Sequence, residues 1–101
     1  MAIVKLQNGK INADDTYTLT PGNGNARTLL VSGSFGSGTA IAGYINGAGN
    51  FIGFKDSTET IITFSADFQI VQDGGIGIKY AIDLQGSTAP NLFVEEHEHG
   101  R

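Results

Sequence analysis

The chain has 101 residues, enough for one small domain and too few for a second hydrophobic core. Six basic residues against ten acidic ones give a formal charge of −4, which argues against a protein that binds nucleic acid through bulk charge. Cysteine is absent, which excludes disulfides, thiolate metal sites and cysteine nucleophiles.

Short segments in which apolar and polar residues alternate follow one another along the chain and predict β-strands. The first, Ile3–Leu6, is expected to form an edge strand or part of an N-terminal arm over residues 1–8. The clearest is 76–84, where alternate residues from Ile76 to Leu84 are apolar. The other strands are expected at residues 16–20, 28–35, 39–45, 51–55, 60–65, 68–72 and 92–95.

Glycine-rich turns separate these segments at intervals of roughly 8–12 residues. Gly36-Ser37-Gly38 has the length of a tight hairpin, and no segment has a convincing helical stripe. About eight short strands predict an antiparallel β-sandwich of jelly-roll type or a small closed barrel. We expect a single sandwich domain over residues 1–94, followed by a charged C-terminal tail over residues 95–101.

Three glycines, Gly43, Gly53 and Gly77, lie inside predicted strands. A glycine in a strand often marks a bulge or a close approach of another backbone. The sequence leaves open whether the approach occurs within one sandwich or against another subunit.

The N-terminal residues contain no long apolar stretch, so they do not predict a signal peptide. No run approaches the ~18 apolar residues that cross a membrane as a helix. We therefore expect no membrane association.

His97 and His99 are the only histidines, and on an extended strand they would point the same way, as a metal-binding pair does. Two imidazoles from one chain would need further ligands from symmetry-related copies. The alternative, which we prefer, is a solvated or partner-contacting tail. The carboxylates are spread over turns and strand edges, and Asp14-Asp15 and Asp56–Glu59 fit turn formation better than catalysis. We expect no enzyme activity and no cofactor.

Carbohydrate binding is the alternative function, as a module of a tail, a fibre or a cell surface. It would need exposed rings and amides at one end of the sandwich, and Tyr44, Asn46 and Asn50 are the candidates. The simpler interpretation is that Tyr44 packs beside Phe51 or Phe54.

Two segments, 30–41 (LVSGSFGSGTAI) and 82–94 (IDLQGSTAPNLFV), resemble a recurrent pattern in small bacteriophage virion β-sandwich proteins. The first reads as a strand, a glycine hairpin and a returning strand. In the second, a strand breaks at a Gly-Ser-Thr-Ala-Pro turn before one last strand. The resemblance implies a non-enzymatic virion protein assembled in the host cytoplasm, either a capsid decoration (cement) protein or a head–tail or fibre component.

As a decoration protein, the chain would form a homotrimer and bridge major capsid subunits without binding nucleic acid. The N-terminal arm is expected to add a strand to a partner, while 92–94 would offer an edge. The expected contact residues are Met1, Ala2, Ile3, Val4, Leu92, Phe93, Val94, Glu95, His97, His99 and Arg101.

Overall fold

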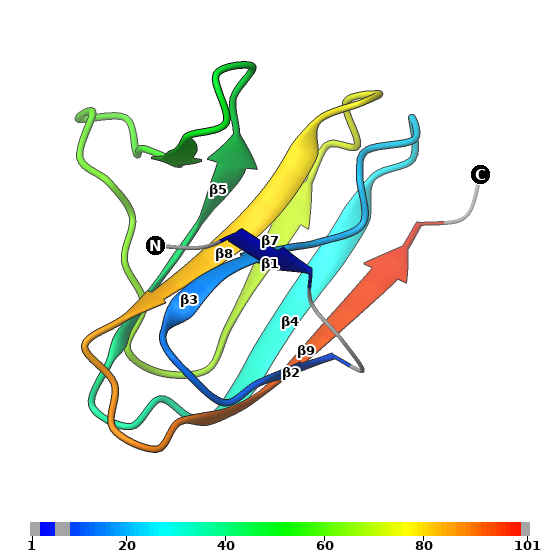
Figure 1. The fold of residues 1–101 in the computed structure, drawn as a ribbon. Coiled ribbons are helices and arrows are strands. Elements are labelled where there is room, and N and C mark those ends of the chain that lie inside the picture. The colour runs from blue at the N-terminus through cyan, green and yellow to red at the C-terminus, as the bar shows by residue number, and fades with distance from the viewer. Residues whose placement is uncertain (1–2, 6–8, 100–101) are drawn as a thin grey trace.

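Nine strands and no helix make up the part of the chain that the structure, a computed structural model, describes, namely residues 3–5 and 9–99 (Figure 1). Among these residues, no helix is long and apolar enough to span a membrane. The strands are β1 (Ile3–Lys5), β2 (Lys10–Ile11), β3 (Asp15–Thr18), β4 (Arg27–Ser34), β5 (Thr39–Ile45), β6 (Phe51–Gly53), β7 (Phe68–Gln72), β8 (Lys79–Gln85) and β9 (Asn91–Glu98).

Two sheets face each other, one in the order β1-β3-β8-β5-β6 and the other in the order β2-β9-β4-β7. All neighbouring strands are antiparallel except β1, which runs parallel to β3. From β2 onward, every connection except β5–β6 carries the chain from one sheet to the other. Leaving β1 aside, this gives two four-stranded sheets with the strand order of a jelly roll, which confirms the predicted fold class.

The core lies between the central strands β4 and β8. Leu29 and Val31 of β4 and Ile82 and Leu84 of β8 are at most 1% exposed, as expected where alternate residues point inward. On the opposite face of β8, the buried Asp83 carboxylate accepts hydrogen bonds from the Thr16 hydroxyl, at 2.7 Å, and from the Gln85 amide.

The best predicted strand begins later than the sequence pattern suggests. Residues 76–78 form a loop, and β8 starts only at Lys79. Gly74 and Gly77 have φ values of +78° and +81°, which lie outside the β region, and Ile76 is 83% exposed. The prediction for 60–65 was also wrong, because only isolated bridges at Ile61 and Phe64 occur there.

The Gly36–Gly38 turn is present, with a hydrogen bond of 2.8 Å from the Gly38 amide to the Phe35 carbonyl. It is not a hairpin, because β4 and β5 belong to different sheets. The turn is a corner of the jelly roll.

Gly43 and Gly53 face each other across β5 and β6. A Cβ atom at Gly43 would lie 2.0 Å from the Ile52 carbonyl oxygen. A Cβ atom at Gly53 would lie 2.8 Å from the Ile41 side chain. The close approach that these glycines permit therefore occurs within one chain.

The expected boundary between residues 94 and 95 is wrong, because β9 continues through Glu98 and pairs with β4 over its whole length. β9 also lies between β2 and β4, so 92–94 is not an edge. Leu92 and Val94 are 1% and 5% exposed and belong to the core. Of the two N-terminal alternatives, an edge strand forms at Ile3–Lys5.

Candidate functional site: an apolar cleft between the sheets

A cleft of about 530 Å³ lies between the two sheets, where β5 and the segment 54–64 face the edge strand β7. Ala42 and Tyr44 line it from β5, and Ile70 and Gln72 line it from β7. The cleft exists because β7 is an edge strand in its sheet, while the segment 54–64 forms only isolated bridges.

Aromatic rings form much of the wall. Phe54 lies between Tyr44 and Tyr80, with ring centroids 6.0 and 6.5 Å away. Phe64, also in the lining, stacks on Phe68 at 3.9 Å. The prediction that Tyr44 packs beside Phe51 or Phe54 is confirmed for Phe54. These rings offer a broad apolar surface to a bound group.

One part of the lining is polar and fixed. The Tyr80 hydroxyl donates to Asp73 Oδ1 at 2.8 Å, and the Gly75 amide donates to the same oxygen at 3.2 Å. The hydrogen bond from Tyr80 is the main cause that lowers the pKa of Asp73. Burial, followed by the contact with Asp73, raises the pKa of Tyr80. At neutral pH the pair is therefore a carboxylate and a neutral phenol.

Gln72 has a different environment. Gln72 is 3% exposed, and neither its amide nitrogen nor its amide oxygen has a hydrogen-bond partner within the protein. These are the only buried side-chain polar atoms without a partner in the described part of the chain. Because buried amides are nearly always hydrogen-bonded, Gln72 is the least expected feature of the cleft.

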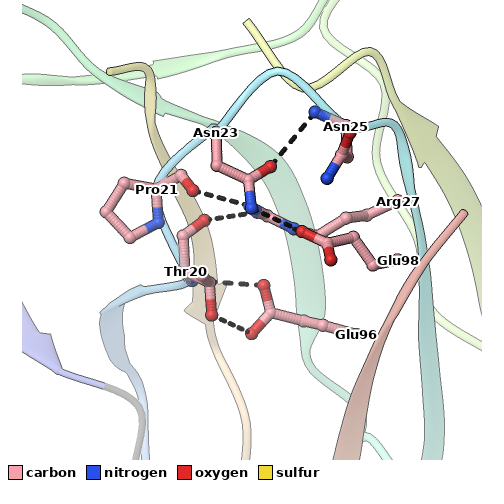
Figure 2. A network of polar contacts seen from close by, with 7 residues as sticks. All are labelled: Thr20, Pro21, Asn23, Asn25, Arg27, Glu96 and Glu98. Carbon is pink, nitrogen blue, oxygen red and sulfur yellow. Dashed lines mark hydrogen bonds and ion pairs between the residues drawn. The ribbon is translucent and has the colours of Figure 1, made fainter. Parts of the chain in front are cut away.

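Arg27 pairs with Gln72 across the sheet, but its side chain makes its polar contacts with other residues (Figure 2). Its guanidinium donates to the carbonyl oxygens of Thr20 and Pro21 at 2.8 and 2.7 Å. Its Nε lies 3.9 Å from the Glu98 carboxylate.

The same network joins β9 to the loop 20–25. The Glu96 carboxylate accepts from the Thr20 amide and hydroxyl at 3.1 and 2.9 Å, and Asn23 donates to Glu98. The acidic residues that the sequence assigned to a tail therefore hold one end of the sandwich together.

Two exposed aliphatic residues, Val71 and Ile78, lie at the cleft, and we call them, together with the nearby loop residue Ile76, the apolar rim. They are 60%, 83% and 36% exposed, and Val71 and Ile78 also line the cleft. Ile76 lies on the loop 73–78, which hydrogen bonds between Gly22 and Gly77 (2.9 Å) and between Gly24 and Gly74 (2.8 Å) fix to the loop 20–25. Ile76 is thus a large apolar side chain that is exposed to solvent on a loop fixed by hydrogen bonds.

The remaining predicted contact residues include two from the N-terminal edge strand β1. Ile3 and Val4 pair with Thr16 and Tyr17 in their own sheet. Met1, Ala2 and Arg101 lie outside the described residues. Phe93 is 47% exposed.

The two histidines contact different partners. His97 Nε2 lies 3.2 Å from Glu95 Oε1, whereas His99 Nε2 lies 2.7 Å from the Thr28 hydroxyl. Within residues 3–5 and 9–99, no group of three or more His, Cys, Asp or Glu side chains could hold a metal ion.

Two of the three carbohydrate candidates, Tyr44 and Asn46, line a common hollow of about 340 Å³. Tyr44 is half-buried in the cleft wall. The Asn46 side chain accepts from the Ala48 and Asn50 amides, at 3.0 Å each, and so shapes its own turn. Asp56 likewise forms a turn, because its carboxylate accepts from the Thr58 and Thr60 amides.

Sequence reasoning missed Gln72 and the exposure of Ile76. Strand parity signals Gln72, because Phe68, Ile70 and Gln72 alternate onto the inner face of β7. For Ile76, the signal is Asp73-Gly74-Gly75, followed by Gly77, which favours a loop. Comparisons with protein-family models, with curated proteins and with solved structures found no match to this chain.

Proposed function

We propose that the chain is a non-enzymatic structural protein of a bacteriophage particle, a trimeric decoration protein that bridges major capsid subunits and stabilises the head. Two features support the proposal. The segments 30–41 and 82–94 resemble small phage virion proteins, and jelly-roll sandwiches recur in viral capsid domains.

The observation that carries the proposal is the apolar rim. Ile76 is 83% exposed on a braced loop, and Val71 and Ile78 are exposed as well, which is typical of a surface that another protein covers. The partner we infer is protein, because the rim is aliphatic and uncharged.

The role follows from mass action. A protein that binds only the assembled lattice stabilises that lattice by about 2.7 kcal/mol per site when its free concentration is 100 times Kd. A trimer presents three copies of each contact, so that weak individual contacts combine into tight attachment.

The test uses particles that lack the protein. Such particles are expected to lose integrity at a lower temperature and under milder osmotic shock than complete particles, and added wild-type protein should restore both. If particles without the protein resist heat and osmotic shock as well as complete ones, the decoration role is wrong.

Two variants test whether the apolar rim is the surface that contacts the particle. Ile76→Asp should bind particles roughly 10- to 100-fold more weakly, because it removes the burial of one isoleucine side chain. Thr88→Asp is the matched control, because it adds the same charge to an exposed residue in the loop 86–90, at the opposite end of the sandwich from the loop 73–78 (Figure 1). Equal binding by the two variants would exclude the apolar rim as the contact.

A further inference from the structure

The cleft has the dimensions and lining of a ligand site. Its volume of about 530 Å³ lies within the range of roughly 300–1,000 Å³ that small-molecule pockets occupy. Aromatic and aliphatic side chains dominate the lining, and its polar groups come from Lys55, Gln72, Asp73 and Tyr80. Gln72 and Asp73 are neighbours in the chain and the Tyr80 hydroxyl donates to Asp73, so a ligand of this cleft has an apolar body and a polar end that faces these three residues.

The hydrogen-bonding state of the polar groups specifies that end. The Tyr80 hydroxyl and the Asp73 Oδ1 atom are paired with each other, and the Arg27 guanidinium is held by Thr20 and Pro21. The Gln72 amide has a donor and an acceptor without partners. The complement of a free primary amide is a group that also presents one donor beside one acceptor.

We propose that the cleft binds a small molecule composed of an apolar ring and an amide-type group, such as a carboxamide or a lactam, which pairs with the Gln72 side chain. The aromatic walls from Tyr44, Phe54 and Phe64 cover the ring. The Gln72 amide atoms are buried, so binding includes a turn of this side chain toward the ligand. The cleft adjoins the proposed particle contact, because Val71 and Ile78 of the apolar rim also line the cleft, whereas Ile76 does not.

Benzamide is the probe, and toluene, which has a methyl group in place of the carboxamide, is its control. In ¹⁵N-labelled protein, millimolar benzamide is expected to shift the side-chain NH₂ signals of Gln72 and the backbone amides of the cleft. The side-chain signals of Gln69, which is exposed on the other face of β7, should not move. This measurement uses the wild-type chain and does not depend on a variant.

Gln72→Met keeps the length of the side chain and removes both hydrogen-bonding atoms. It should weaken benzamide binding about tenfold and leave toluene binding unchanged, whereas Gln69→Met should change neither. Equal affinity of the wild type for benzamide and toluene would overturn the proposal. So would benzamide binding that Gln72→Met does not alter, or shifts confined to residues outside the cleft.

Ile76→Asp separates the two proposals, since it should weaken particle attachment roughly 10- to 100-fold and leave benzamide binding intact. Failure of benzamide to bind would end the ligand proposal without affecting the decoration role.

Discussion

Replacement of Gln72 by methionine is expected to stabilise the ligand-free protein. Gln72 is 3% exposed, and its amide nitrogen and oxygen both lack partners within the protein, although water binds them in the unfolded chain. A buried polar group left unpaired costs about 1–3 kcal/mol. Methionine has a similar volume and no such cost, so the free energy of unfolding should rise by about 1–2 kcal/mol, an increase in Tm of roughly 4–16 °C for a domain of this size.

Urea denaturation followed by circular dichroism measures the change. Gln69→Met is the matched control, because Gln69 is exposed on the same strand, and its free energy of unfolding should stay within about 0.5 kcal/mol of wild type. If Gln72→Met unfolds at a lower urea concentration than the wild type, the amide has a partner in the free protein. In that case the reasoning about the cleft is wrong.

Three further predictions concern stability. Arg27→Met should lower the free energy of unfolding by about 2–3 kcal/mol in urea denaturation, because it removes hydrogen bonds that a charged group makes at 2.7 and 2.8 Å. Gly43→Ala should lower the free energy of unfolding by about 1–3 kcal/mol, because its Cβ atom would clash with a carbonyl oxygen, whereas Gly47→Ala, with nothing within 4 Å, should not destabilise the protein. Equal thermal stability of the two variants would contradict the close approach at Gly43. Because the pKa of Asp73 is lowered in the folded protein, its carboxylate contributes stability that is present above the usual pKa of 3.8 and is lost as the pH falls through the lowered pKa. Asp73→Asn should therefore reduce the loss in the free energy of unfolding that acidification causes.

The fold class follows from the sequence because alternation and glycine turns are local signals. β5 and β7 match the predicted ranges at both ends, since each alternation stops at a clear turn. β8 does not, because isoleucines at 76 and 78 continue the period of the strand through a loop. Period alone does not separate a strand from a loop with correctly spaced apolar residues.

The contacts of the C-terminal acidic residues could not be predicted from the sequence alone. Glu96 and Glu98 read as a solvated tail, since no local pattern indicates that Thr20 and Arg27 lie beside them. These contacts join residues more than 70 positions apart. The cleft was beyond prediction for the same reason, because it depends on which strands end each sheet.

The proposed association of the chain with phage particles is tested most directly by mass spectrometry of purified virions, with imaging to locate the protein. The account predicts that the chain is present in many copies on the head, in a multiple of three at each binding position. Absence from purified virions, or a location on the tail alone, would contradict it.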